Sequence, residues 1–292
     1  MPASPIRKLI PYAEKAKGEG RKVYHLNIGQ PDIETPQVML DAVRNNQLKV
    51  IEYSHSAGNE SYRRKLVGYY SKFGINLDYS DIMVTTGGSE AIEIAMMTCL
   101  NEGDEVIIPE PFYANYLGFG TQAGVRVCPI ESSIETGFAL PPVAEFEKRI
   151  NSSTKAIMIC NPGNPTGYLY TREELQKLAD IALKYDIVII SDEVYREYVY
   201  DGKQQISMLD FPELAENCII IDSESKRYSM CGVRIGCMVT RSNKIRNAAM
   251  LFAQARLSPG MVEQIAGAAA VDTPDSYFEK VNTEYTLRRD TL

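Results

Sequence analysis

The amino-acid sequence predicts an α/β fold in which a mainly parallel central sheet is sandwiched by helices. Short apolar runs alternate with longer amphipathic segments through the middle of the chain. The short runs are apolar at consecutive positions, which is typical of strands buried on both faces. The 292 residues, 45% hydrophobic and 24% charged, suit one large domain with a smaller second one and rule out a mainly disordered chain.

The expected elements follow one another in strand–helix order. Six strands are expected, at 82–85, 105–108, 155–159, 187–190, 218–221 and 236–240. Helices are expected at 6–17, 90–100, 171–185, 243–255, 261–271 and 275–289. Thr171 and Glu174 have the spacing of a capping box, which marks a helix start. In a fold of this kind, ligands bind outside the carboxyl ends of the strands.

Composition argues against several classes of function. The net charge is −7, from 31 basic and 38 acidic residues, and without a long basic run nucleic acid is not an expected partner. No apolar stretch approaches the ~20 residues of a membrane span, and the first residues lack the apolar core of a signal peptide. Six scattered cysteines without a CxxC pair indicate free thiols in a reducing cytoplasm. With two histidines in the chain, no metal site is expected.

Two expected strand ends carry turns suited to ligand contacts. Gly87, Gly88 and Ser89 follow the first strand, and glycines there let backbone N–H groups approach an anion at a helix N-terminus. A plain tight turn would also explain them. After the third strand, two Asn-Pro pairs stand within seven residues, at Asn161 and Asn164. Prolines fix the backbone, so this loop suits an asparagine that clamps a ligand.

Two further strand ends carry charges. Asp192 ends a buried strand, where a carboxylate is costly unless it has a partner, either a ligand cation or an arginine or lysine of the chain. Lys226 follows the next strand, with Ser223 before it and Arg234 eight residues after it. One ligand would use an anion cradle, an amide, a carboxylate, a lysine and an arginine together. That ligand is pyridoxal phosphate (PLP), a phosphorylated, protonated aromatic ring with an aldehyde.

The motifs that surround these residues complete a recognisable set. From residue 4 to residue 292 the chain resembles the class I/II aminotransferases, PLP enzymes of fold type I, the aspartate aminotransferase type. The motifs that carry the resemblance are Gly29-Gln-Pro-Asp32, Tyr53 with Gly58, Gly87-Gly-Ser89, Pro111-Phe-Tyr113, Asn164-Pro-Thr-Gly167, Asp192 with Tyr195, and Ser223-x-x-Lys226 followed by Arg234-x-Gly236.

The resemblance implies a role for each matched residue. Lys226 would form the Schiff base with PLP and, once freed by substrate, would move the proton between substrate Cα and the cofactor. Asp192 would pair with the ring nitrogen. Asn164 and Tyr195 would hydrogen-bond the ring hydroxyl, and Tyr113 would stack on the ring. The phosphate would be held by Gly88, Ser89, Ser223 and Arg234.

Other matched positions concern the substrate and a second subunit. Tyr53 would reach the phosphate of the neighbouring subunit, so a homodimer is implied. Gly29 and Asn164 would contact the substrate. Arg256 falls near a loop that in some members binds the substrate side chain, although a helix-end surface arginine is the alternative. His25 and His55 are expected to serve packing or the rim of the site.

Two departures from the family pattern stand out. Glu224 takes a position that is usually apolar or small, although the Ser223–Lys226 spacing is intact.

We expect residues 1–30 to associate with the small domain, 31–258 to form the large PLP-binding domain, and 259–292 to be a linker helix and the start of a truncated small domain. The arginine that clamps the substrate α-carboxylate has no match, because Arg288 and Arg289 fall too early.

The sequence therefore predicts a cytoplasmic, homodimeric aminotransferase that moves an amino group between an L-amino acid and a 2-oxo acid, with 2-oxoglutarate as the expected acceptor. A PLP-dependent C–S β-lyase on the same scaffold and a PLP-sensing regulatory module are the alternatives. A non-PLP α/β enzyme is disfavoured, because the chain has no G-x-S-x-G, G-x-x-x-x-G-K-[ST] or H-E-x-x-H motif.

Overall fold

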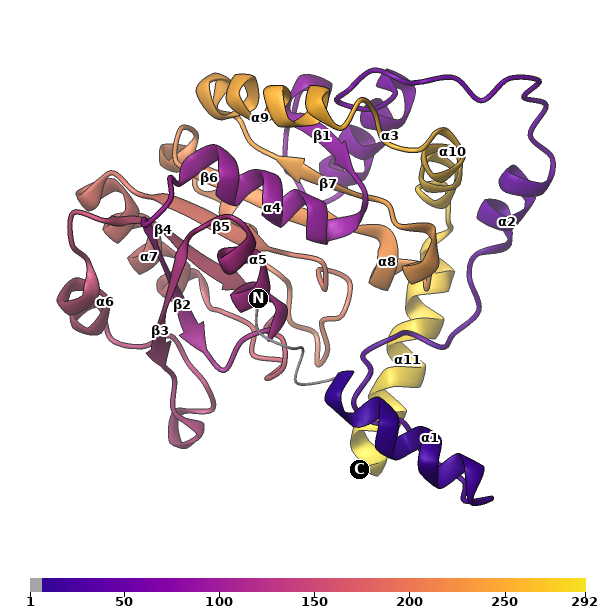
Figure 1. The fold of residues 1–292 in the computed structure, drawn as a ribbon, viewed down its shortest axis with the longest axis horizontal. Coiled ribbons are helices and arrows are strands. Elements are labelled where there is room, and N and C mark those ends of the chain that lie inside the picture. Colours follow the sequence, from indigo (N-terminus) through magenta and orange to yellow (C-terminus); the bar gives the residue numbers. More distant parts are fainter. Residues whose placement is uncertain (1–6) are drawn as a thin grey trace.

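The fold is centred on a seven-stranded sheet with helices on both sides (Figure 1). The computed structural model describes residues 7–292, so Ser4 and Ile6, where the resemblance and the first helix were expected to begin, lie outside the described residues. The strands stand in the order β1-β7-β6-β5-β4-β2-β3. They are β1 (Ile82–Thr85), β2 (Glu105–Glu110), β3 (Arg126–Glu131), β4 (Thr154–Cys160), β5 (Val188–Asp192), β6 (Cys218–Ser223) and β7 (Gly236–Val239).

The helices occupy the segments between and beyond these strands. The α-helices are α1 (Ile10–Gly18), α2 (Gln37–Arg44), α3 (Glu60–Ser71), α4 (Gly87–Cys99), α5 (Asn115–Gln122), α6 (Val143–Arg149), α7 (Arg172–Tyr185), α8 (Glu224–Arg227), α9 (Asn243–Ala255), α10 (Met261–Ala270) and α11 (Asp275–Thr291). The 3₁₀ turns are η1 (Arg7–Leu9), η2 (Tyr79–Asp81), η3 (Ile134–Thr136), η4 (Met208–Asp210), η5 (Pro212–Leu214) and η6 (Cys231–Val233). No helix within residues 7–292 is long and apolar enough to cross a membrane.

The mainly parallel sheet is confirmed, and its two departures have physical reasons. Strands β2 to β6 pair in parallel, whereas β7 runs antiparallel to both β6 and β1. The sequence did not predict β3, because this edge strand is half exposed and carries Arg126, Pro129 and Glu131. A strand with one open side lacks the continuous apolar run of the buried ones.

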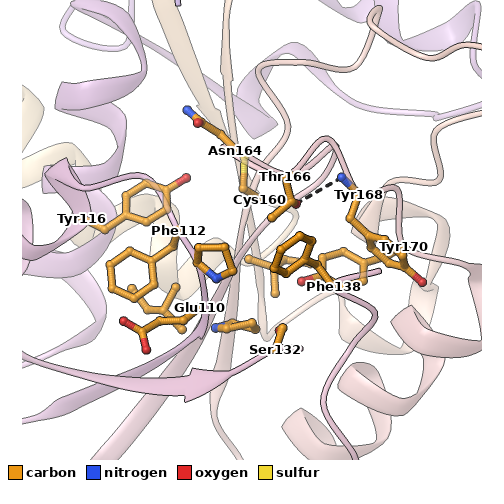
Figure 2. Close-up of a pocket in the computed structure, with 15 residues that line it drawn as sticks. Glu110, Phe112, Tyr116, Ser132, Phe138, Cys160, Asn164, Thr166, Tyr168 and Tyr170 are labelled. Atoms are coloured by element: carbon orange, nitrogen blue, oxygen red, sulfur yellow. Dashed lines mark hydrogen bonds between the residues drawn. The ribbon is translucent and has the colours of Figure 1, made fainter. Parts of the chain in front are cut away.

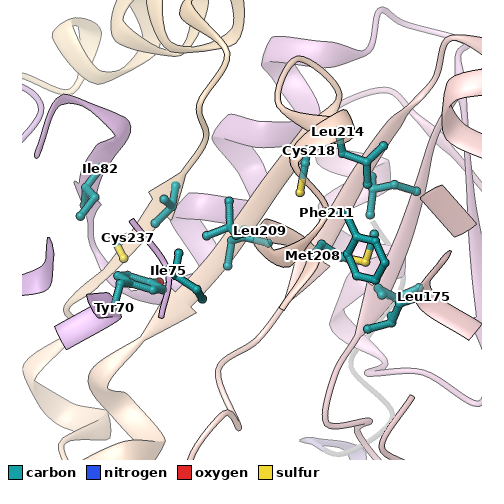
Figure 3. Close-up of a cluster of buried hydrophobic side chains, with 14 of the residues drawn as sticks. Tyr70, Ile75, Ile82, Leu175, Met208, Leu209, Phe211, Leu214, Cys218 and Cys237 are labelled. Carbon is teal, nitrogen blue, oxygen red and sulfur yellow. The ribbon is translucent and has the colours of Figure 1, made fainter. Parts of the chain in front are cut away.

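The core lies in two layers, one on each face of the sheet. Neighbouring strand residues alternate between the layers: Ile157 and Ile159 of β4 join one cluster, and Ala156 and Met158 join the other. The first cluster packs under α3, α6, α7 and α10 and extends to Met208 and its neighbours (Figure 3). The second packs under α4, α5 and α9. Burial on both faces is therefore what made the strand residues apolar at every position.

The predicted starts of two helices, α7 and α4, can be compared with the structure. The predicted capping box forms at α7, where the Thr171 side chain accepts from the Glu174 amide and the Glu174 side chain accepts from the Thr171 amide. Helix α4 begins at Gly87, three residues before the expected Glu90, so the glycines form its first turn. The Glu90 carboxylate instead accepts from the Thr86 amide at 2.7 Å and caps the helix.

The first and last helices stand apart from the sheet. In Figure 1, α1 and α11 lie near one another below the sheet. Helix α1 has no buried residue, and Val281 is the buried residue of α11. The division into residues 1–30, 31–258 and 259–292 stays a prediction.

Candidate active site

The loops that carry the predicted site residues meet at one edge of the sheet. In the register of the parallel strands, Cys160 of β4 lies beside Asp192 of β5, and Asp192 lies beside Ile221 of β6. The Asn161–Gly167 loop, Asp192 and the Ser223–Lys226 segment therefore leave the sheet side by side. This is the carboxyl edge, where a fold of this class binds ligands.

Asp192 is a buried carboxylate with neutral hydrogen-bond partners. The Tyr116 hydroxyl donates to its Oδ2 at 2.6 Å, and the Val194 amide donates to its Oδ1 at 3.3 Å. Burial raises the pKa of Asp192 to about 6, although both hydrogen bonds oppose the rise. Two other buried carboxylates of this region, Glu193 and Asp222, each pair with an arginine.

Backbone and guanidinium come together at the start of α4. Gly87 has φ +74°, and a Cβ there would lie 2.5 Å from Nη2 of Arg234. A Cβ on Gly236 would lie 2.9 Å from the Gly87 carbonyl carbon, and one on Gly88 would lie 3.7 Å from Cβ of Ser223. At Gly87 and Gly236 a side chain would be strained or would collide, whereas the contact at Gly88 is an ordinary one. A helix N-terminus, a serine and an arginine thus share one small region, which suits a phosphate.

Lys226 reaches from α8 toward the segment near the N-terminus. Its Nζ donates to the Gly29 carbonyl oxygen at 2.8 Å and lies 3.9 Å from Sγ of Cys231. The side chain is half-buried. The structure therefore brings the Gly29 carbonyl next to the lysine amine, and the contact of Gly29 with a substrate stays a prediction.

Aromatic and amide groups complete the edge. The Asn164 side-chain amide donates to Oη of Tyr195 at 3.4 Å. Tyr113 meets Tyr116 edge to face, with ring centroids 5.5 Å apart, and its hydroxyl accepts from Asn115 at 2.6 Å. Burial and the charge of Asp192 raise the pKa of Tyr113, and burial raises that of Tyr195. Both phenols therefore stay protonated at neutral pH.

Aromatic side chains pack beneath the loop that holds Asn164 (Figure 2). Phe112, Tyr116, Phe138, Tyr168 and Tyr170 line a cavity of about 20 Å³ beneath it, which is room for about one water molecule. The Asn164 side chain points away from this cavity. The cavity is too small for a substrate, and its rings support the loop from below.

Four other residues singled out in the sequence are exposed or partly buried. Tyr53 is 79% exposed. Arg256 is partly buried: its Nη2 donates to the carbonyls of Ser56 and Val84, and its Nε pairs with Glu90. His25 and His55 are exposed.

Glu224 points away from the lysine into a buried polar cluster. It is 2% exposed, its Oε1 accepts from the Tyr62 hydroxyl, and Gly267 of α10 packs against it. Burial raises the pKa of Glu224 to about 8. The Tyr62 hydroxyl thus satisfies one carboxyl oxygen of Glu224 within the Ser223–Lys226 motif, whereas Oε2 is buried without a hydrogen-bond partner among the described residues.

Sequence reasoning did not identify Tyr116 and Tyr198. Tyr116 lies three residues after Tyr113, in the first turn of α5, so a second tyrosine this close in the sequence was a signal. Tyr198 donates its hydroxyl to the Lys226 carbonyl at 2.6 Å, a contact between residues far apart in the chain. Nothing in the sequence around Tyr198 indicates such a contact.

Comparisons with known proteins identify the family of the chain. Residues 21–292 match the family model for aminotransferase class I and II. The chain is 33% identical over 284 residues to aspartate aminotransferase of Bacillus subtilis, which covers 96% of this chain and 72% of that protein. It is 30% identical over 292 residues to aromatic-amino-acid aminotransferase 2 of Thermococcus litoralis, covering 98% of this chain and 74% of that protein.

A solved structure extends the agreement to the fold. Alanine aminotransferase from Pyrococcus furiosus superposes with a TM-score of 0.91 at 30% identity, over 99% of this chain and 75% of that one. Because the superposition covers 99% of this chain, it takes in the mostly parallel seven-stranded sheet. The chain belongs to the class I and II aminotransferases and is an aminotransferase.

Proposed function

We propose that this aminotransferase uses PLP to move an amino group between an L-amino acid and a 2-oxo acid, with 2-oxoglutarate as the acceptor. The observation that carries the proposal is the buried Asp192 carboxylate. Its hydrogen-bond partners are a hydroxyl and an amide, so its charge is left for a cation from a ligand. A pyridinium nitrogen is such a cation.

The surrounding residues fit the rest of the cofactor. The start of α4, with Gly88 and Ser89, together with Ser223 and Arg234, would hold the phosphate. Asn164 and Tyr195, already in contact at 3.4 Å, would bind the ring hydroxyl. Tyr113 would cover one ring face. The cradle is shaped by glycines at which an added Cβ would collide with Arg234 or the opposite backbone, which is the form that a bound phosphate requires.

When bound, PLP supplies an electron sink for the bond changes at the substrate Cα. Asp192 would keep the ring nitrogen protonated and so keep that sink effective. The Lys226 amine would bond the cofactor aldehyde and, once released by substrate, would carry the proton at Nζ. Its contact with the Gly29 carbonyl at 2.8 Å holds that nitrogen at the substrate end of the site. General acid–base transfer needs such a fixed donor–acceptor geometry.

The amino donor is a separate proposal. The compared relatives are named for aspartate, aromatic amino acids and alanine, so we propose a donor within this range. Arg256 stays a predicted side-chain ligand, although its guanidinium already binds Ser56, Val84 and Glu90. A donor panel therefore has to include acidic, aromatic and small amino acids.

We propose a homodimer because residues 26–53 include several large apolar side chains that are exposed. Large apolar side chains stand exposed before and around Tyr53, at Leu26 (95%), Ile28 (55%), Val50 (67%) and Ile51 (66%). Such a cluster is typical of a surface that another chain covers. Sedimentation velocity should show a dimer. We also propose that the enzyme works in the reducing cytoplasm, which its six free cysteines support.

Absorbance spectroscopy with PLP tests the proposal. We expect a visible band, trapped by borohydride on Lys226, and its conversion to the pyridoxamine form by one or more amino acids of the panel. Lys226→Ala should abolish the trapped adduct, whereas Lys244→Ala, on α9, should leave it. An adduct on another lysine would contradict the assignment. Pyruvate and ammonia from a cysteine-like substrate would indicate a β-lyase, and a band that no amino acid changes would indicate a sensor.

A further inference from the structure

The catalytic lysine stands on a helix that cannot fix its own position. Helix α8 is a single turn, Glu224–Arg227, and one turn of helix is not stable by itself. The following residue that donates back to the Lys226 carbonyl, Ser229, has φ +52°, a conformation that non-glycine residues rarely adopt. The place of this segment therefore depends on contacts from other elements.

Tyr198 supplies a strong contact of this kind. Its hydroxyl donates to the Lys226 carbonyl oxygen at 2.6 Å. Its ring meets Tyr195 edge to face, with centroids 6.1 Å apart. Burial raises the pKa of Tyr198 well above its ordinary value, so the hydroxyl remains a donor throughout the working pH range. One side chain thus touches both the main chain of the lysine and the tyrosine assigned to the cofactor hydroxyl.

Helix α11 holds Tyr198 from the other side. The rings of Tyr198 and Tyr285 meet edge to face, with centroids 5.6 Å apart. Near the other end of α11, the Tyr277 hydroxyl donates to the Ser229 side chain at 3.4 Å. Figure 1 shows α11 running down past α8. The turn that carries the lysine is therefore held at two points by residues of, or next to, one helix.

We propose that Tyr198 is a positioning residue for Lys226, and that Tyr285 keeps Tyr198 in place. The lysine side chain is long and flexible, so the location of Nζ depends on where its main chain is anchored and on the Gly29 carbonyl that it binds. Tyr198 fixes the first of these. This inference rests on the proposed function, because it concerns the lysine that is assigned there to PLP.

The test compares three variants of the full chain. Tyr198→Phe removes the hydroxyl and keeps the ring. Tyr285→Leu removes the ring contact that supports Tyr198. Tyr185→Phe is the matched control, because it removes a similar hydroxyl contact, to Glu147 at 3.2 Å, on α7. Each is loaded with PLP, and the pH midpoint of its visible absorbance is measured together with the rate of its reaction with a saturating amino acid.

We expect Tyr198→Phe to shift the absorbance midpoint and to lower the maximal rate about tenfold, the size of one well-formed hydrogen bond. The substrate concentration for half-maximal rate should change little. Tyr285→Leu should shift both readouts in the same direction, and the double variant should be no worse than Tyr198→Phe alone. Tyr185→Phe should match the wild type in absorbance midpoint and in maximal rate. Its melting temperature should fall about as much as that of Tyr198→Phe, because each variant loses one hydroxyl hydrogen bond.

A wild-type midpoint and rate in Tyr198→Phe would overturn the inference, as would equal effects in Tyr185→Phe. Additive effects of the Tyr198 and Tyr285 changes would overturn the role of Tyr285. Failure of the proposed function has a different signature. In that case the wild-type chain itself shows no PLP trapped on Lys226.

Discussion

Two carboxylates at the ends of neighbouring strands have opposite surroundings. Asp222, in β6, pairs with the buried guanidinium of Arg227 and accepts from the Tyr70 hydroxyl at 2.9 Å. Asp192, at the end of β5, meets a hydroxyl and an amide. The fold neutralises the first carboxylate with its own arginine, whereas the second has only neutral partners in the described part of the chain, and the proposed function assigns its charge to a ligand. On that proposal, one buried acid serves structure and the acid of the neighbouring strand binds the cofactor.

The largest effect should follow from changing the ligand-facing carboxylate. Asp192→Asn keeps the shape of the side chain, with Oδ1 accepting from the Val194 amide and Nδ2 donating to the Tyr116 oxygen, but it carries no charge to hold a ring nitrogen protonated. We therefore expect the amino-acid half-reaction to slow about 1000-fold. The same change should stabilise the cofactor-free chain. The pKa of Asp192 is raised from 3.8 to about 6, so its contribution to the free energy of unfolding falls as pH rises from about 4 to 6.

The amide has no such titration. At pH 7 the free energy of unfolding of cofactor-free Asp192→Asn should exceed that of the wild type by about 3 kcal/mol, since a pKa raised from 3.8 to about 6 costs about 1.4 kcal/mol per unit. Urea unfolding at pH 4.5 and pH 7 measures this. A variant that loses both rate and stability would show that Asp192 is structural, and the contrast with Asp222 would fail.

The second effect concerns the paired carboxylate. Arg227→Met leaves Asp222 buried without its cation, and we expect the free energy of unfolding to fall by about 4 kcal/mol. Arg64→Met, which removes an exposed partner of Glu60, is the control and should cost less than about 1 kcal/mol. Equal and small losses in urea unfolding would mean that the buried pair does not neutralise Asp222 as the comparison requires.

The third effect concerns Glu224, a buried carboxylate that, unlike Asp222, has no arginine partner within residues 7–292 and that is not assigned to a ligand. Burial raises the pKa of Glu224 from 4.5 to about 8, so the folded chain keeps a proton that the unfolded chain releases. Its contribution to stability therefore decreases as pH rises from about 4.5 to 8. Glu224→Gln can still accept from Tyr62, and it should be more stable than the wild type by about 4 kcal/mol at pH 8 and nearly equal to it at pH 4.5. Parallel stability curves across this pH range would contradict the assignment.

The smallest effect should come from the hydroxyl next to Asp192. Tyr116→Phe removes the hydrogen bond that favours the ionised carboxylate, so the pKa of Asp192 should rise further. We expect the half-reaction rate at neutral pH to fall about tenfold and its acidic limb to move to higher pH. A pH profile of the rate measures both. An unmoved acidic limb would show that Tyr116 only packs against the carboxylate.

Much of this arrangement could be predicted from the sequence, because a strand buried on both faces is apolar at every position. The polar residue that follows it, such as Asp192 or Lys226, then stands out. Strand β3 could not be found in this way, since one of its sides is open. The antiparallel direction of β7 also leaves no mark on its four buried residues.

Contacts across the fold were harder to predict than strand ends. Tyr116 and Asp192 are 76 positions apart, and Tyr198 and Lys226 are 28 apart. Tyr198 does not differ locally from a packing residue, and the position of Tyr116 near Tyr113 does not indicate its contact with Asp192. The sequence also marks Glu224 only as a departure from the family pattern, because the Tyr62 that donates to it lies on α3. Local patterns predict which groups end a strand, whereas tertiary packing determines which of them are neutralised.

The most direct test of the central claim compares two ligands on two proteins. PLP and its analogue with C–H in place of the ring nitrogen differ only in the cation that Asp192 is proposed to bind. Their dissociation constants are measured on the wild-type chain and on Asp192→Asn. The account predicts that the wild type binds PLP at least about tenfold more tightly than the analogue, and that Asp192→Asn binds both alike. An equal preference for PLP in both proteins would contradict it.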